Sequence, residues 1–412
     1  MKIRLFALLS LATLFLASGC VPEELRLRRD LENDTCVNIA AILPLTGSNK
    51  RYGDKMLEGL NFALEEVNSR RGLGGLPVRL VVLDSGSTAE GAARAVLEAA
   101  RQNVVAVIAG YDTNEVSAIL PHVAELRLPT VIPMATDNEH VNFSQFVFRN
   151  IYTDRQQAET IAAYLWYWRK VMRLGILVDM APKEEYSRNI ARDVAGYFSE
   201  LGGNVVCTAE FRSGEDYEKQ LREILTHAPR AILLPVEARL AAQMIKKLRE
   251  LGYRGIICGP DSWDSEALVF GLAGLEEPGD CIYMGLFSDE SRRRNFQEFK
   301  REFAAKRYHT PGSSEVQSYD ALMLLLIGLS DADDILKFKK NWLTIRQHSG
   351  AAAVYTMLPN GQIDRTMYIK SIAPPNVANP DPYSRMLLEF QYSKLETYRD
   401  SLDASTEKDK ED

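Results

Sequence analysis

The chain has 412 residues, of which 46% are hydrophobic and 25% are charged, the composition of an ordinary soluble globular protein. This length exceeds one ordinary hydrophobic core, so we expect two domains. The formal net charge of -7 argues against nucleic acid as a partner, and much of the acidity lies in residues 400–412.

The first 19 residues have the pattern of a bacterial export signal. Two basic residues precede an apolar run, Leu5 to Ala17, which is too short to span a bilayer as a mature helix, and Ser-Gly-Cys follows. Small residues before a cysteine resemble the lipobox of bacterial lipoproteins, in which the cysteine, here Cys20, is lipidated and becomes the mature N-terminus. An ordinary cleaved signal peptide is the alternative. We expect a signal peptide at 1–19 and a lipidated tether at 20–36.

The next part of the chain alternates strands and helices. Unbroken apolar runs predict buried parallel strands, and apolar residues at helical spacing predict helices between them. The strands are expected at 39–45, 78–83, 104–110, 130–134 and 146–148. Residues 50–54 lead into a first helix, whose apolar face runs from Met56 to Val67, and further helices are expected at 88–102 and 113–126. Repeated β-α units predict a parallel, doubly wound sheet with right-handed crossovers.

The same pattern begins again after a helix at 154–169. The strands are expected at 174–178, 205–211, 231–234, 255–258 and 281–284, with helices at 187–201, 217–225 and 238–251. Two consecutive helices, at 292–308 and 314–329, then end the β-α series, so we expect them to return and cover the first lobe. Residues 335–346 and a hairpin with Asn360-Gly361 are expected to complete the second lobe.

The predicted fold class is therefore α/β, with two doubly wound parallel-sheet lobes joined by a hinge. The first lobe comprises 37–154 and 285–333, and the second comprises 155–284 and 334–375. Four prolines at 374–382 mark a linker, and residues 376–412 are expected to form this linker and a weakly helical or disordered acidic tail.

Exported proteins usually pair their cysteines, but the spacing here fits no zinc site. Cys258 and Cys281 are expected at opposite edges of one sheet, beyond disulfide reach. We predict that Cys36, Cys207, Cys258 and Cys281 are all unpaired, the last three mostly buried, and a disulfide from Cys36 stays open as an alternative.

The sequence contains no pattern for catalysis. The nucleophile elbow, the zinc-protease motif, the P-loop and the dinucleotide-binding glycine motif are all absent, and the five histidines are scattered. We expect no enzymatic activity, no cofactor and no metal site.

Polar and aromatic residues instead gather at predicted strand ends, where α/β sheets bind ligands. Thr113 and Asn114 suit the cap of a helix, whose free N–H groups, with the Thr113 hydroxyl, can hold a carboxylate. Each such residue alone has an ordinary structural explanation, and only their shared position favours a ligand cleft. The residues are Tyr52, Tyr111, Asp112, Thr113, Thr136, Tyr186, Glu237, Asp261 and Trp263.

Six strings occur in order through both predicted lobes: ILPLTG, RYGDKMLEGLNFALEEVN, GLGGLPVRLVVLD, AGYDTNEVSAILP, VIPMAT and IICGPDSWD. Together they resemble the leucine/isoleucine/valine-binding protein family, the type I periplasmic binding proteins, over residues 38–373. The resemblance implies two α/β lobes, three hinge crossings and a ligand enclosed as the lobes close.

The resemblance also implies roles for single residues. In that family a hydroxyl residue after the third strand, here Thr113, and a threonine after the fourth, here Thr136, hold the α-carboxylate of an amino acid. An acidic residue after Gly-Pro, here Asp261, holds the α-ammonium group. Tyr52 and Tyr186 match aromatic positions around the ligand.

Three residues depart from the family pattern. Met134 stands where a small residue is usual, Asp112 adds an acid beside Thr113, and Glu237 replaces a residue that is often aromatic. These departures favour a polar or cationic ligand over a branched-chain amino acid.

The sequence thus predicts a lipid-anchored extracytoplasmic solute-binding protein, in the periplasm or at the cell surface of a bacterium. It would capture an amino acid or similar small polar ligand and deliver it to the permease of an ABC importer. The alternative is a lipoprotein of the same fold that acts as a ligand sensor or a protein-interaction scaffold.

Overall fold

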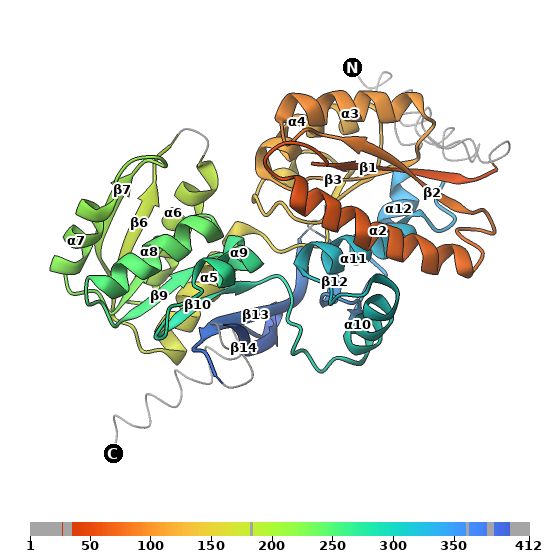
Figure 1. The fold of residues 1–412 in the computed structure, drawn as a ribbon. Coiled ribbons are helices and arrows are strands. Elements are labelled where there is room, and N and C mark those ends of the chain that lie inside the picture. The colour runs from red at the N-terminus through yellow and green to blue at the C-terminus, as the bar shows by residue number, and fades with distance from the viewer. Residues whose placement is uncertain (1–26, 28–34, 182–183, 360–361, 377–382, 396–412) are drawn as a thin grey trace, which may run out of the picture.

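The computed structural model describes residue 27 and residues 35–181, 184–359, 362–376 and 383–395. The predicted signal peptide, Cys20, most of the tether and the acidic end of the chain lie outside these residues. Within them, no helix is long and apolar enough to cross a membrane. The chain forms two α/β lobes, each built around its own sheet (Figure 1).

The first lobe has a parallel sheet with the strand order β2-β1-β3-β4-β5. Its strands are β1 (Val37–Leu43), β2 (Val78–Asp84), β3 (Ala106–Ala109), β4 (Thr130–Ile132) and β5 (Val147–Arg149). Its helices are α2 (Lys50–Ser69), α3 (Ala89–Arg101), α4 (Thr113–Glu125), η2 (His140–Asn142), α10 (Arg294–Arg307), α11 (Ser313–Leu329) and α12 (Ile335–Trp342).

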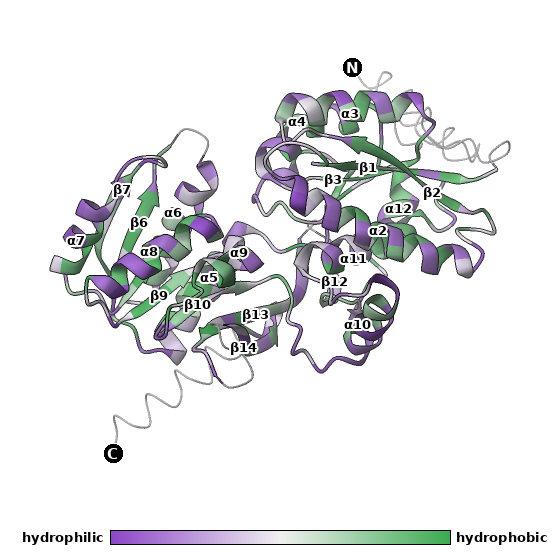
Figure 2. Ribbon diagram, viewed as in Figure 1, coloured by the Kyte–Doolittle hydropathy of each residue, from purple (hydrophilic) through white to green (hydrophobic). Residues whose placement is uncertain are grey.

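Alternating side chains of β1 explain why helices cover both faces of this sheet. Ala40 and Ile42 pack with α3 and α4, whereas Ile39 and Ala41 pack with α2, α10, α11 and α12. Figure 2 shows the strands largely hydrophobic and the helices with one hydrophobic and one hydrophilic side. The prediction that α10 and α11 return to cover the first lobe is confirmed.

The second lobe is built on a mixed sheet with the order β11-β12-β13-β10-β9-β8-β6-β7, and β14 also pairs with β13. The β12 end of this sheet extends to the core of the first lobe. Its strands are β6 (Arg173–Asp179), β7 (Asn204–Phe211), β8 (Ala231–Leu233), β9 (Ile256–Gly259), β10 (Cys281–Gly285), β11 (His348–Ser349), β12 (Val354–Met357), β13 (Ile363–Ala373) and β14 (Tyr383–Gln391). Its helices are α5 (Asp154–Ala163), η3 (Tyr164–Trp168), α6 (Glu185–Glu200), α7 (Glu218–Thr226), α8 (Ala238–Glu250), η4 (Asp261–Trp263), α9 (Glu266–Gly271) and η5 (Tyr392–Lys394). Strands β6 to β10 are parallel, as predicted.

The structure differs from the predicted lobe boundary at residues 334–357. Phe338 and Trp342 of α12 pack against Phe148 in the core of the first lobe, and β12 contributes Tyr355 to the same core. The third crossing therefore lies within β13, where Ile363 packs in the first core and Ile369 in the second. An amphipathic helix shows that one face is buried but does not show which lobe buries it.

The prediction of a linker and tail at 376–412 is wrong for the residues that form β14. This strand pairs antiparallel with β13, and Phe390 is buried in the core of the second lobe. Pairing with β13 supplies the backbone hydrogen bonds that made a strand favourable there. Residues 396–412 lie outside the described part of the chain.

The four cysteines in the described part of the chain are free, as predicted. Their expected placement is partly wrong, because Cys207 is only half-buried and Cys258 is not far from Cys281. Cys281 pairs in register with Ile257, the neighbour of Cys258, on adjacent strands. The two thiols stay apart because successive side chains of a strand face opposite sides of the sheet.

The three crossings between the lobes meet at Arg365. Its side chain is fully buried, and its guanidinium group donates to the carbonyl of Asn150 at 3.0 Å and to that of Leu286 at 2.7 Å. Asn150 lies in the first crossing, Leu286 in the second and Arg365 in the third. The rings of Tyr152 and Tyr355 lie 5.4 and 5.5 Å from the guanidinium carbon. One buried cation thus ties all three crossings together.

We expect Arg365→Met to lower the free energy of unfolding by about 3 kcal/mol, because it removes the hydrogen bonds of the guanidinium group and leaves the Asn150 carbonyl buried and unpaired. Arg365→Lys should recover only part of this loss, since an ammonium group lacks the planar fork. Urea unfolding measures both values, with Arg212→Met at an exposed position as the control. A loss below about 0.5 kcal/mol in Arg365→Met, the range of ordinary surface substitutions, would contradict this role.

Candidate functional site

The first lobe contributes a stacked aromatic pair at the end of β3. Gly110 turns the chain there with φ +98°, a conformation that favours glycine, and a Cβ atom would lie 2.1 Å from the Val116 side chain. Tyr111 follows, and its ring lies 4.6 Å from the ring of Tyr52, nearly parallel to it. Two of the predicted residues therefore form one aromatic wall.

Helix α4 begins differently from the prediction. Asp112, not Thr113 or Asn114, is the N-cap, and its Oδ1 accepts the backbone N–H of Glu115 at 2.9 Å. The Glu115 carboxyl group is buried beside it and accepts from the Ser85 hydroxyl at 3.0 Å. Burial, with the charge of Asp112, raises the pKa of Glu115 to about 7. The helix start that was expected to hold a ligand carboxylate thus already carries two acidic groups.

Asp261 of the second lobe is buried, with 9% of its surface exposed. The Tyr186 hydroxyl donates to its Oδ1, and its backbone N–H donates to Gln157 Oε1 at 2.5 Å. Burial raises the pKa of Asp261 to about 6, although the bonds from Tyr186 and Gln157 oppose the shift. These bonds fix the carboxylate at the end of β9, as the sequence predicted for its position.

Asp154, the first residue of α5, stands between the lobes. Its backbone N–H donates to the carbonyl of Thr136 from the first lobe at 2.8 Å, and its charge acts on Asp261 and Tyr186 of the second lobe. Burial is the main cause that raises the pKa of Asp154 to about 7. Asp154 Oδ1 and Gln157 Nε2 are buried and have no hydrogen-bond partner among the described residues. An open acceptor and an open donor therefore lie beside Asp261.

Glu237, immediately before α8, is exposed to solvent but close to charges from both lobes. Partial desolvation of its carboxyl group, followed by the charges of Glu184, Asp261 and Asp112, raises the pKa of Glu237 above its usual range. Its charge also contributes to the raised pKa of Tyr111 across the lobes. Glu237 is thus a second acidic point of the site.

Two predicted residues take other places. Trp263 is fully buried, and its indole N–H donates to the Val236 carbonyl at 3.0 Å, so it belongs to the core and not to a cleft surface. Met134 is half-buried and packs against the cores of both lobes. The prediction missed Glu115, Tyr152, Asp154, Gln157 and Glu184, which the sequence presents as ordinary residues of helices and crossings.

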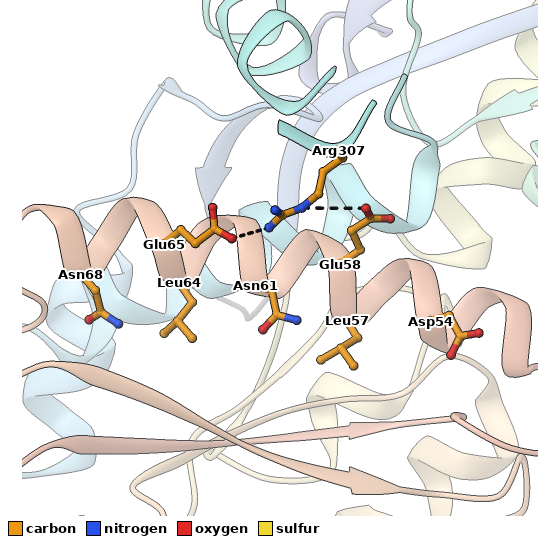
Figure 3. A pocket seen from close by; sticks show the side chains of 8 residues that line it. All are labelled: Asp54, Leu57, Glu58, Asn61, Leu64, Glu65, Asn68 and Arg307. Atoms are coloured by element: carbon orange, nitrogen blue, oxygen red, sulfur yellow. Dashed lines mark hydrogen bonds and ion pairs between the residues drawn. The ribbon is translucent and has the colours of Figure 1, made fainter. Parts of the chain in front are cut away.

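A hollow of about 760 Å³ lies elsewhere, along α2 of the first lobe (Figure 3). Arg307 of α10 reaches over it to Glu58 and Glu65. None of the predicted site residues lines it. We place the site at the strand ends, because acidic groups with shifted pKa values from both lobes meet there.

One trio in the described residues offers atoms suited to a metal: Glu58, His309 and Glu315, with ligand atoms within 4.8 Å of one another. Cations already accompany these carboxylates, since Lys55 Nζ lies 3.8 Å from Glu315 and Arg307 Nε lies 3.8 Å from Glu58. The trio is best explained as part of an ion-pair network on the first lobe.

The raised pKa values predict a pH-dependent stability. A carboxyl group whose pKa rises on folding keeps its proton up to a higher pH in the native state than in the unfolded state. Its contribution to stability is therefore full below the unfolded pKa and is lost as the pH rises through the folded pKa. For Asp154 these values are 3.8 and about 7. The ligand-free protein should therefore lose about 1 kcal/mol of stability between pH 6 and pH 8 through Asp154.

Asp154→Asn should reduce that loss, as measured by urea unfolding at both pH values. His140, whose pKa burial lowers to about 4, acts in the opposite direction in both proteins and cancels from the comparison. Glu200→Gln, at the exposed end of α6, is the charge-matched control. An equal pH dependence in the parent and Asp154→Asn would contradict the assignment.

Comparisons with known proteins identify the family of this chain. The sequence model of the periplasmic binding protein family matches residues 36–373. A Leu/Ile/Val-binding protein of Escherichia coli (strain K12) is 20% identical over 312 residues, which cover 74% of this chain and 82% of that protein.

Solved structures show the same fold. A leucine-binding protein of Thermotoga maritima MSB8 superposes with a TM-score of 0.73 at 24% identity, covering 86% of this chain and 98% of that chain. A branched-chain amino acid transporter substrate-binding protein of Streptococcus pneumoniae, in complex with isoleucine, gives a TM-score of 0.74 at 19% identity, covering 85% and 99%. With two lobes, three crossings and polar groups that converge between them, this chain belongs to the periplasmic binding proteins of type I, in the Leu/Ile/Val-binding protein family.

Proposed function

We propose that this solute-binding protein is anchored by a lipid at Cys20, captures an amino acid or similar small polar molecule between its lobes, and delivers it to the permease of an ABC importer. The observation that carries the proposal is the convergence of Thr136 and Tyr111 from one lobe with Tyr186, Glu237 and Asp261 from the other. The ligands named for the relatives support an amino acid or a similar molecule. A binding role, not catalysis, accounts for these groups.

The contacts between the lobes suit a protein that opens and closes. Away from the hinge, Arg51 and Lys55 of α2 pair with Glu266 of α9, and the Tyr52 hydroxyl lies 3.3 Å from Ser265 Oγ. Exposed ion pairs contribute only about 0–1 kcal/mol each, so they can break and form again. Closure around a ligand would then depend on what the ligand itself contacts.

Asp261 is the expected partner of a ligand ammonium group. The Tyr186 hydroxyl and the surrounding protein hold its carboxylate in place, and no Lys or Arg pairs with it among the described residues. A ligand ammonium group would supply the missing positive charge in a site shielded from water. The Thr113 and Thr136 positions are proposed, from the resemblance, to contact the carboxylate of an amino acid.

We expect one or more members of an amino acid, amide and diamine panel to stabilise the soluble protein, taken from Glu23, in thermal unfolding. A ligand at 100 times its Kd adds about 2.7 kcal/mol. Asp261→Asn keeps the shape but removes the charge, and should weaken binding of that ligand by about 2 to 5 kcal/mol in calorimetry. Glu215→Gln, at an exposed position, is the control.

Small-angle scattering gives an independent measurement. The radius of gyration should fall at saturating ligand if the lobes close. If no panel member stabilises the protein and the radius of gyration does not change, the proposed capture is rejected. That outcome would favour the protein-interaction scaffold. Binding of Asp261→Asn within about threefold of the parent, or about 0.7 kcal/mol, would reject the ammonium assignment alone.

Lipid anchoring has its own test. Cys20→Ser removes the thiol that the lipid would modify, so the protein should leave the membrane fraction or stay unprocessed. Fractionation of cells that express each form, with mass spectrometry of the N-terminus, measures this. If Cys20→Ser still sediments with membranes at the parent level, the anchor lies elsewhere.

A further inference from the structure

We propose that Asp264 is a positioning residue of the site: it ties the turn that carries Asp261 to the hinge and, through Ser313, to the first lobe. This inference rests on the proposed function, because it gives Asp264 the task of holding Asp261 where a ligand between the lobes would meet it. Binding at Asp261 and the position of the first lobe would then be linked through one side chain.

The first step is the turn that contains both aspartates. Asp261 opens the short helix η4, and the backbone N–H of Asp264 donates to the Asp261 carbonyl at 2.8 Å. The side chain of Trp263, between them, is fully buried in the core of the second lobe. Because the two aspartates share one hydrogen-bonded turn, a displacement of Asp264 also displaces the backbone of Asp261.

The second step is the carboxylate of Asp264, which is bonded at both oxygens. Its Oδ1 accepts from the Lys370 ammonium group at 2.6 Å, and its Oδ2 accepts from the Leu286 N–H at 2.8 Å. The side chains of Lys370 and Asp264 are only 7% and 4% exposed, and the rings of Tyr283 and Phe287 lie 5.7 and 5.6 Å from Lys370 Nζ. Leu286 lies in the second crossing, and Lys370 lies in β13, which contains the third. A buried, charge-assisted cluster therefore holds the turn to the hinge.

The third step is the link to the first lobe. The hydroxyl group of Ser313, the first residue of α11, donates to the same Asp264 Oδ2 at 2.8 Å. The two residues after Asp264 also face the first lobe: Ser265 Oγ lies 3.3 Å from the Tyr52 hydroxyl, and Glu266 pairs with two cations of α2. One short segment thus carries the acid of the site at one end and contacts α2 and α11 along the rest.

The Ser313 bond gives this link a measurable consequence. It forms in the same arrangement in which Tyr52 of the first lobe meets the segment that carries Asp261. Loss of the bond should lower the fraction of molecules in which the turn and the first lobe are both in place. The apparent affinity for a ligand falls in proportion to that fraction.

Ser313→Ala is the variant that tests the link, because it removes the bond to the first lobe and leaves the pair of Asp264 and Lys370 intact. Asp264→Asn is more direct, but it leaves a buried ammonium group without its carboxylate and can unfold the protein. In hydrogen-exchange mass spectrometry of the ligand-free soluble protein, the backbone amides of 261–265 should exchange at least about threefold faster in Ser313→Ala than in the parent. Ser313→Thr, which keeps the hydroxyl group, and Ser330→Ala, at the exposed end of α11, should match the parent.

Calorimetry with leucine, lysine and glutamine gives the second measurement. Ser313→Ala should weaken binding of the probe that binds the parent most tightly by about tenfold. In an Asp261→Asn background the same substitution should have little further effect, since Ser313 acts through the Asp261 turn. A general loss of stability would not produce this coupling between the two positions.

Unchanged exchange at 261–265 in Ser313→Ala would overturn this inference and leave the proposed function standing. An equal loss of affinity with and without the Asp261 carboxylate would overturn it as well. If none of the three probes binds the parent, the proposed capture of an amino acid fails, whereas faster exchange in Ser313→Ala would still support the link from Asp264 to the first lobe.

Discussion

The buried guanidinium group of Arg365 holds together the three chain segments that join the lobes. A fully buried cation needs hydrogen bonds to be tolerated, and here two carbonyl groups from the other crossings supply them, with two tyrosine rings at its faces. The Gln317 side chain donates to the same Leu286 carbonyl at 3.1 Å. Since α5 begins four residues after Asn150, the position of Asp154 between the lobes depends on this cluster.

Contacts between the lobes therefore fall into two kinds. Those at the hinge are buried, charge-assisted and mutually supporting, so they set where each lobe pivots. Those at the far edge, between α2 and α9, are exposed ion pairs of long side chains. The difference in burial makes the hinge the fixed element and the far edge the reversible one, which is the arrangement that a ligand-driven closure requires.

The acids of the site sit at helix starts. Asp112 caps α4, Asp154 opens α5 and Glu237 precedes α8. Helix starts stabilise negative charge through their free N–H groups and the positive end of the helix dipole. This support lets the protein keep carboxylates where desolvation and mutual repulsion raise their pKa values. Positions that bind anions in many α/β proteins thus become a source of negative charge here.

Much of the architecture follows from the sequence itself. Apolar runs such as Val104 to Gly110, alternating with amphipathic segments, determine parallel sheets with helices on both faces, because these periodicities are local properties of the chain. The same reasoning predicted Asp261, Thr136, Tyr52 and Tyr111 near strand ends. In the structure Asp261 follows β9, Thr136 follows β4 and Tyr111 follows β3, whereas Tyr52 lies in the first turn of α2. The strand-end rule needs only the order of elements.

The tertiary structure decided the rest. It placed α12 in the first lobe, added β14 to the second sheet and turned Trp263 into the core. It also brought Asp154 and Gln157 to Asp261, which lies more than one hundred residues away in sequence. Periodicity shows that a face is buried but not which surface covers it, and the direction of a side chain after a strand depends on the turn that follows. Contacts between distant segments are therefore fixed only when both lobes have packed around the hinge.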